Sequence, residues 1–211
     1  MYKVKLTDLH INMPILGNIC SVALPMAFQS CLTTLSNVIV QGYINYVGAA
    51  VMAGWGAYNK IDSFIFLPIQ SMANAATTFV SQNWGAGHLD RADKGFLTTL
   101  ALGEVVTITS IILIWIFAPF TVQLFSDDIN VINAGVNFLR VNIPFIVFSC
   151  VINILAGGLR GKGDATGPMV ILLIGFVAVR QTYLLIVTRF VANTAKLVGF
   201  GYPVGWMATA I

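Results

Sequence analysis

The chain has 211 residues, of which 57% are hydrophobic and 9% are charged, and its mean hydropathy is +0.85. Soluble domains carry roughly 25% charged residues, so this composition excludes a soluble fold. The net charge of +3 comes from scattered basic residues, which excludes the clustered basic face that nucleic-acid binding requires. No charged residue occurs between Leu9 and Asn59, which indicates a chain embedded in a membrane.

Six apolar segments follow one another along the chain. A helix that crosses the hydrocarbon core needs about 20 apolar residues, and we divide the sequence at its charged or turn-forming clusters. Short connectors favour an all-α, polytopic transmembrane bundle, with residues 1–211 forming a single lobe. The first apolar run is longer than that of a signal peptide, so it is interpreted as a spanning helix. The predicted spans are residues 11–40, 49–81, 96–120, 131–159, 169–189 and 197–211.

The sixth predicted span is shorter than the others. Its 15 residues cover about 22 Å of a hydrocarbon core that is about 30 Å thick. We therefore expect this span to be incomplete and the sequence to be truncated. A short re-entrant end is the alternative.

The basic residues predict the orientation of the bundle. With the N-terminus in the cytoplasm, six of them lie on the inner side, against Arg189 and Lys196 outside. The positive-inside rule then predicts a multi-pass protein of the cell membrane with a cytoplasmic N-terminus. Helix lengths place Lys60 and Arg140 at the outer rim, with Asp62 at most one turn deeper. The inner six are Lys3, Lys5, Arg91, Lys94, Arg160 and Lys162.

Polar residues form stripes on three of the predicted spans. Unpaired polar groups in hydrocarbon cost several kcal/mol each, so the stripes must face one another or water. Together they predict a polar cavity, and hydrogen bonding between helices is the alternative for each residue. Proline inside the same three spans, at Pro25, Pro68 and Pro144, suits helices that bend around a cavity. The stripes are Gln29, Thr33, Asn37 and Gln41 with Ser36; Gln70, Asn74, Thr77 and Ser81; and Asn142, Ser149 and Asn153.

Two ionisable residues are predicted near the middle of the membrane. Glu104 lies about 15 Å of helix past Lys94, and Arg180 lies about 18 Å past Pro168. An ionisable group at this depth predicts a functional site. Glu104 could carry a proton or bind a coupling cation, or it could neutralise Arg180 in a structural pair. Both interpretations stay open at this stage.

Catalytic and metal-binding motifs have little support. Cys20, Cys31 and Cys150 lack paired or metal-ligand spacing and are predicted to be small buried hydrophobes. His10 and His88 fall near membrane boundaries. Gly161-Lys162-Gly163-Asp164 fits the G-x-G-D pattern of intramembrane aspartyl proteases, but no second aspartate lies at the same depth. The sequence therefore predicts no enzyme, no metal and no cofactor.

Several segments together resemble the multidrug and toxin extrusion (MATE) family of transporters. The resemblance spans about Gly17 to Trp206, nearly the whole chain. It is carried by Leu24-Pro25, Gln29 and Ser36-Asn37; by Phe79-Val80-Ser81-Gln82-Asn83-Trp84-Gly85-Ala86-Gly87 with Arg91-Ala92; by Phe138-Leu139-Arg140 with Pro144; and by Leu159-Arg160-Gly161-Lys162-Gly163-Asp164 with Pro168-Met169.

This resemblance implies one lobe of a transporter with twelve helices in two lobes of six. Ser36-Asn37 and Ile44-Asn45 look more like the second lobe, so another six-helix lobe, from the same gene or a partner chain, is implied. Family members exchange H⁺ or Na⁺ for organic, often cationic, compounds across the lipid bilayer. Some place an acidic cation ligand ten residues before the Leu of the Leu-Arg-Gly signature, where this chain has Ser149.

The function predicted from sequence is cation-coupled antiport that exports organic compounds. The alternatives are a lipid-linked sugar flippase of the related superfamily, and a non-transporting membrane scaffold or gene fragment. The candidate residues of the substrate and ion cavity are Gln29, Asn37, Gln41, Gln70, Asn74, Ser149, Asn153, Glu104 and Arg180.

Overall fold

The computed structural model describes residues 12–210, which form helices and turns without any strand. Lys3, Lys5 and His10, used in the sequence analysis, lie outside the described residues. The helices are α1 (Met13–Asn45), α2 (Ala49–Gly85), α3 (Leu89–Ile116), α4 (Ala118–Gln123), α5 (Ile129–Asn142), η2 (Ile143–Phe145), α6 (Ile146–Gly161), α7 (Thr166–Leu173), η3 (Ile174–Val179), α8 (Arg180–Phe190), α9 (Ala195–Gly199) and α10 (Gly201–Ala210).

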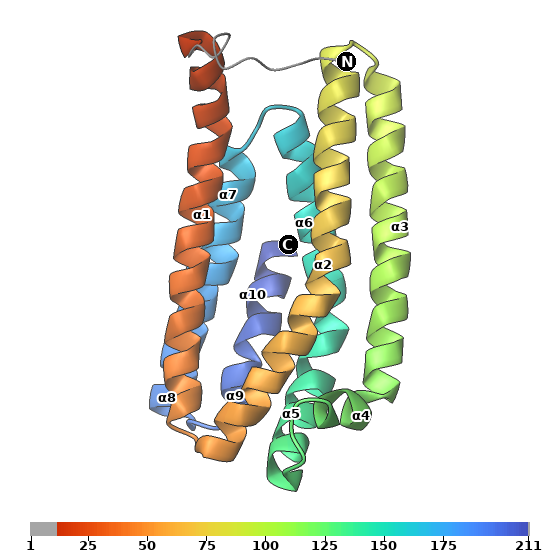
Figure 1. The fold of residues 1–211 in the computed structure, drawn as a ribbon. Coiled ribbons are helices and arrows are strands. Elements are labelled where there is room, and N and C mark those ends of the chain that lie inside the picture. Colours follow the sequence, from red (N-terminus) through yellow and green to blue (C-terminus); the bar gives the residue numbers. More distant parts are fainter. Residues whose placement is uncertain (1–11, 211) are drawn as a thin grey trace, which may run out of the picture.

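The prediction of an all-α bundle of six segments is confirmed. The first three spans are α1, α2 and α3, the fourth is α5 with η2 and α6, the fifth is α7 with η3 and α8, and the sixth is α9 with α10. Figure 1 shows the segments running up and down. The α2–α3 and α6–α7 connections lie toward one end of the bundle, and the other connections lie toward the opposite end. This alternation is that of a polytopic membrane protein.

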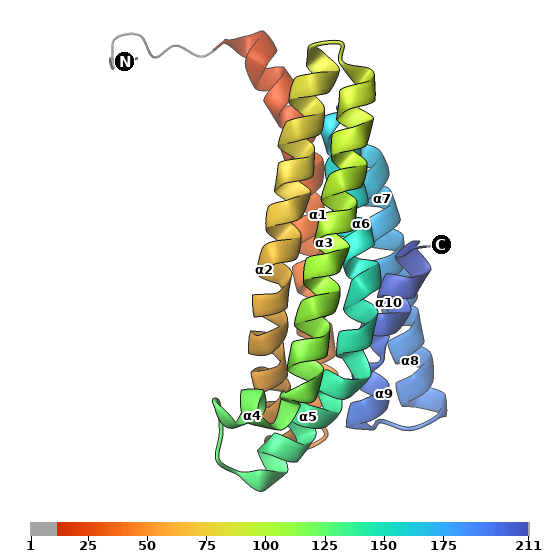
Figure 2. The same ribbon diagram turned by 90° about the vertical axis from the view of Figure 1, so that its right-hand side faces the viewer.

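Four helical runs are long and apolar enough to cross a membrane: Met13–Asn45, Leu89–Ile116, Ile129–Gly161 and Thr166–Phe190. The 37-residue α2 is not among them, because Lys60, Asp62 and its amides reduce its hydropathy. α2 runs beside α3 in the upper part of Figure 1 and bends away from it below, and Figure 2 shows that both helices span the length of the bundle. A bilayer crossed by α3 is therefore also crossed by α2.

Local sequence explains where several helices begin or change course. The side chain of Asn12 accepts a hydrogen bond from the Ile15 amide and caps α1, and Asp128 caps α5 in the same way. Pro144 lies in the 3-10 turn η2, which separates α5 from α6, whereas Pro25 and Pro68 lie inside continuous helices. Of the three prolines, only Pro144 therefore marks a change of helix type.

Glycine allows α6 to pack closely on α2. A Cβ atom on Gly157 would lie 2.4 Å from the Ala73 carbonyl oxygen, and one on Gly161 would lie 2.8 Å from that of Thr77. The Thr77 hydroxyl also donates a 2.9 Å hydrogen bond to the Gly157 carbonyl. Two glycines four residues apart form one small face of a helix, which is how helices approach closely in lipid. This contact positions the fourth span against the central helix α2.

The close contact predicts that Gly157→Ala destabilises the fold. The added methyl group meets backbone, so the helices must separate, and overpacking of this kind costs about 1 to 3 kcal/mol. We expect a lower thermal midpoint for the purified protein in detergent. Gly56→Ala is the matched control, because a Cβ atom there meets nothing within 4 Å. Equal midpoints for the two variants would contradict the close contact.

Candidate functional site

Arg180 at the start of α8 is fully buried and is held by α1. Its Nη2 atom donates hydrogen bonds to the Ser36 hydroxyl oxygen and, at 2.9 Å, to the Asn37 Oδ1 atom. The guanidinium carbon lies 4.7 Å from the centre of the Tyr202 ring on α10. The Tyr202 hydroxyl donates to the same Asn37 oxygen at 3.2 Å. One cation thus links α1, α8 and α10.

Ser36 is the other member of this network. Its hydroxyl donates a 3.1 Å hydrogen bond to the carbonyl of Phe176, which lies in the π-helical turn η3. Gln181 donates to the hydroxyl and to the carbonyl of Ser36. A π-helical turn disrupts the regular α-helical hydrogen bonds, and here a side chain from another helix satisfies one of its carbonyls. We call Ser36, Asn37, Arg180, Gln181 and Tyr202 the arginine network.

Small residues bring α10 close enough to join the arginine network. A Cβ atom on Gly175 would collide with the Thr209 side chain and lie 3.0 Å from the Gly205 carbonyl oxygen. α10 therefore packs directly against η3. This contact places Tyr202 over the guanidinium of Arg180.

An aromatic layer lies beside the arginine network, between α2 and α10. The ring centres of Trp55 and Tyr202 are 5.5 Å apart, and those of Phe66 and Trp206 are 6.4 Å apart. Asp62 lies on α2 between these two contacts, four residues from Phe66. Its Oδ1 atom is buried and has no hydrogen-bond partner in the structure. The depth estimate from sequence had placed this carboxylate near the outer rim.

Glu104 occupies a separate, apolar environment in α3. Both of its carboxylate oxygens are buried without a hydrogen-bond partner, and it lies beside Cys150 of α6. A structural pair between Glu104 and Arg180 is wrong. Within residues 12–210, the one salt bridge joins Lys162 to Asp93, and the Nη2 atom of Arg180 donates to α1. The similar predicted depth of the two residues in the membrane had suggested the pair. Depth does not determine which way a side chain faces or which helix lies next to it.

The remaining candidates form separate local groups. Gln41 donates to Asn45, Gln70 donates to Asn74, and Asn153 donates to Ser149, in each case four residues along the same helix. Gln29 accepts a 3.5 Å hydrogen bond from Arg160 of α6. Among the nine candidates, the structure joins Asn37 directly to Arg180, whereas Gln70 and Asn74 lie exposed on α2.

The structure also bears on the cysteines and the G-x-G-D motif. All three cysteines are free, and Cys150 is buried as expected. The prediction that Cys31 is buried is wrong, because Cys31 lies exposed on α1. Most residues of α1 are exposed. The Asp164 carboxylate accepts a 2.8 Å hydrogen bond from the Gly167 amide at the start of α7. Asp164 thus orders the turn that leads into α7.

The sequence analysis missed Gln181, Tyr202, Tyr58 and Trp206. Tyr58, Asp62 and Phe66 recur at steps of four, so the sequence alone could have placed them on one face of α2. No pattern within α2 indicates that α10 covers this face. Likewise, no sequence signal joins Tyr202 to a residue 165 positions earlier.

The arginine network predicts different outcomes for the two midplane residues. Arg180→Leu removes the charge-assisted hydrogen bonds from α8 to Ser36 and Asn37 of α1, so we expect a loss of at least about 2 kcal/mol. Glu104→Gln removes no ion pair and should leave the thermal midpoint and membrane abundance unchanged. Thermal unfolding in detergent and immunoblots of membranes measure both. Similar losses in the two variants would contradict the network.

Comparison with known proteins identifies the family. Residues 25–181 match the MatE family. The chain is 25% identical to YpnP of Bacillus subtilis, a probable multidrug resistance protein, over 183 residues, which is 87% of this chain and 41% of the relative. It is 22% identical to YoeA of the same organism, also a probable multidrug resistance protein, over 90% of this chain and 41% of the relative. The chain spans about two fifths of the length of these curated relatives.

Solved structures show the same fold. One is described as the outward-facing conformation of a multidrug resistance MATE family transporter of the MOP superfamily; it has a TM-score of 0.87 at 18% identity and covers 98% of this chain and 47% of that chain. The MATE transporter ClbM in complex with Rb⁺ has a TM-score of 0.86 at 21% identity. This match covers 94% of our chain and 46% of the ClbM chain. The family match covers more than half of the chain, so this multi-pass membrane protein belongs to the MatE family.

Proposed function

We propose that residues 1–211 form one six-segment lobe of a transporter that exports organic, often cationic, compounds in exchange for H⁺ or Na⁺. Family membership supports transport, and the names of the relatives support multidrug efflux. The proposed partners are the lipid bilayer, organic cations as substrates, and a second six-helix lobe from the same gene or another chain. The solved MATE structures are about twice as long as the part that this chain matches.

The observation that carries this proposal is the exposed amide pair on α2. Gln70 and Asn74 lie near the middle of a helix that runs beside α3, and both side chains are exposed on the bundle. Their single mutual hydrogen bond, 3.3 Å long, leaves most of their donors and acceptors free. Lipid cannot satisfy such groups, so this face of α2 must meet water or another polar surface.

A second set of exposed polar groups lies on α1. Asn37 and Asn45 are exposed, and Gln41 between them is partly exposed. In the proposal, these residues and the α2 amides line the side of the lobe that faces the substrate pathway. The other polar candidates are less exposed. Gln29 accepts a hydrogen bond from Arg160, and Asn153 donates one to Ser149 within α6. Glu104 is proposed as a carboxylate available to a coupling ion, and Arg180 as the cation that fixes α1.

The proposed orientation places the N-terminus in the cytoplasm. The α2–α3 and α6–α7 connections lie at the same end of the bundle (Figure 1). Lys162 lies in the second connection, and Arg91, Lys94 and Arg160 lie in the adjoining turns of α3 and α6. A cysteine at Gly163 should therefore react with an impermeant thiol reagent only from the cytoplasmic side, and one at Asp127 only from outside. The native cysteines are replaced by serine for this measurement. Labelling from the reverse sides would contradict the orientation.

The substrate pathway is tested by thiol accessibility and by export in one experiment. A cysteine at Asn74 should react with a small water-soluble thiol reagent, and the reaction should block export of ethidium from cells that express the protein together with its second lobe. The matched control is a cysteine at Ile112, which is also exposed on the bundle but has apolar neighbours on α3 and should face lipid. Ethidium accumulation equal to that of cells without the protein would contradict the function. Equal inertness of the two cysteines would contradict the pathway.

A further inference from the structure

We propose that a cavity between α2, α5 and α9 binds the headgroup of an anionic phospholipid, and that Arg140 and Lys196 hold its phosphate. The cavity has a volume of about 550 Å³, and its polar lining is Asn137, Arg140 and Lys196. α5 and α9 lie at the end of the bundle opposite the α2–α3 and α6–α7 connections (Figure 1). Neither cation is a candidate for the substrate and ion cavity. The site rests on geometry and charge, whereas the leaflet in which the lipid lies rests on the proposed orientation.

One face of α5 forms most of the cavity. The lining residues on α5 include Ala134 and the positions three, four and seven residues later, which is the spacing of a single helix face. Arg140 follows Asn137 by three residues and lies in the last turn of α5. Lys196 lines the cavity from near the start of α9. Both cations are exposed, so basic side chains from two helices flank the opening of one cavity.

Packing fixes the walls of this cavity. The buried Phe138 ring of α5 lies edge-to-face on Trp55 of α2, with ring centres 4.9 Å apart. A Cβ atom on Gly199 of α9 would lie 2.9 Å from the Phe138 ring, so the glycine lets α9 approach α5 closely. The Tyr183 hydroxyl of α8 donates a 3.1 Å hydrogen bond to the Leu197 carbonyl and holds α9 from its other side. The spacing of α5 and α9 is therefore set without either cation.

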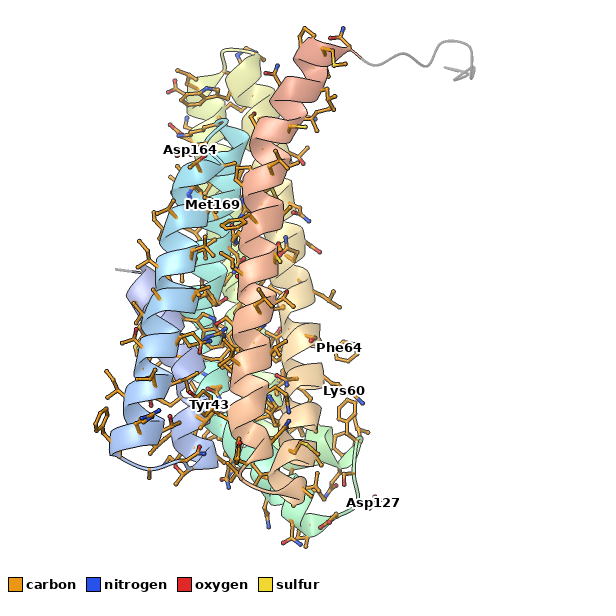
Figure 3. The ribbon with its side chains drawn as sticks, turned by 90° about the vertical axis from the view of Figure 1, so that its left-hand side faces the viewer. Tyr43, Lys60, Phe64, Asp127, Asp164 and Met169 are labelled. Carbon is orange, nitrogen blue, oxygen red and sulfur yellow. The ribbon has the colours of Figure 1, made fainter. Side chains whose placement is uncertain are left out.

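No carboxylate of the described residues pairs with either cation. The one salt bridge in this part of the chain lies at the other end of the bundle, between Lys162 and Asp93. The exposed acids at the cavity's end are Asp127, labelled in Figure 3, and Asp128, which caps α5. Arg140 lies 12 residues after Asp128, about 18 Å along the helix, which exceeds the screening length of about 8 Å in physiological salt. The positive charge of the cavity thus calls for an anion from outside the protein.

Trp115 places Arg140 at the boundary of the membrane. The guanidinium carbon of Arg140 lies 5.6 Å from the centre of the Trp115 ring, in the last turn of α3. This ring is 47% exposed on a helix that is long and apolar enough to cross a membrane. Tryptophan is enriched at membrane–water interfaces, at the level of the lipid headgroups. Arg140 therefore lies at the depth of the phospholipid phosphates.

The lining of the cavity fits a phospholipid headgroup. Arginine and lysine bind phosphate through charge-assisted hydrogen bonds, and the Asn137 amide adds two donors. Val51, Val141 and Ala195 offer apolar contact to the first methylenes of the acyl chains. An anionic phospholipid balances the two cations better than a zwitterionic one, which brings its own ammonium group. In the proposed orientation, this lipid belongs to the outer leaflet.

Native mass spectrometry can count the bound lipid. The purified full chain in dodecyl maltoside, a detergent without phosphate, is titrated with phosphatidylglycerol or phosphatidylcholine, and we expect tighter binding of phosphatidylglycerol. Arg140→Gln and Lys196→Gln should each weaken this binding about tenfold, because each removes a charge-assisted hydrogen bond. Arg189→Gln is the matched control, since Arg189 is an exposed cation in the last turn of α8 and does not line the cavity. Equal loss in the control, or equal binding of the two lipids, would overturn the site.

A third variant separates loss of the site from loss of the fold. Asn137→Asp keeps both cations and places a carboxylate beside them, so it should release phosphatidylglycerol as Arg140→Gln does. The exposed position of Asn137 predicts an unchanged thermal midpoint for this variant. Full retention of phosphatidylglycerol by Asn137→Asp would overturn the site.

Competition distinguishes a lipid from a soluble phosphate. Glycerol 3-phosphate carries the same phosphate without acyl chains and gains nothing from the apolar walls of the cavity. An equimolar amount should therefore leave phosphatidylglycerol bound. Displacement of phosphatidylglycerol under this condition would overturn the assignment to a lipid.

Discussion

The arrangement of this bundle depends on one buried cation. Arg180 is out of contact with solvent at the middle of an apolar protein, where an unpaired guanidinium would be very costly. Its bonds to Ser36 and Asn37 attach α1, which has few other polar contacts with the bundle, to α8. The stack on Tyr202 adds α10 to the same point. Three segments that are remote in sequence thus meet at one side chain.

Small residues make this meeting possible. Close packing of Gly175 against Gly205 and Thr209 brings α10 to η3, and the Gly157 and Gly161 contact brings α6 to α2. In lipid, close approach of helices replaces much of the hydrophobic driving force that soluble proteins use. The glycine contact between η3 and α10 therefore brings Tyr202 within reach of Arg180. The π-helical turn η3 begins six residues before Arg180, and its Phe176 carbonyl is satisfied from α1.

The sequence predicts the spans well and their contacts poorly. Hydropathy identifies six segments because every backbone amide in lipid must be paired within its own helix. The amide pair Gln70 and Asn74 was predicted to lie on one helix face, and the structure keeps it exposed there. Depth along the membrane suggested Glu104 as the partner of Arg180, but the rotation of α3 points it at Cys150 of α6. The rotation of a helix about its axis, and the helices that lie beside it, depend on packing between segments that are far apart in the sequence. A local sequence pattern does not show this packing.

The surroundings of Asp62 also could not be predicted from the sequence. Its distance along the helix from Lys60 suggested the rim of the membrane, and counting residues could not show that α10 packs against the neighbouring Trp55 and Phe66 of α2. Family membership and the exposed amides support transport.

A double-mutant cycle between Asn37 and Arg180 tests the attachment of α1 most directly. Thermal stability in detergent is measured for Asn37→Ala, Arg180→Leu and the double variant, and Glu104→Gln with Arg180→Leu serves as the control pair. A shared hydrogen bond predicts that the losses of the two single variants are not additive, with an interaction energy of about 0.5 to 3 kcal/mol, while the control pair is additive. Additive losses in both pairs would contradict the account.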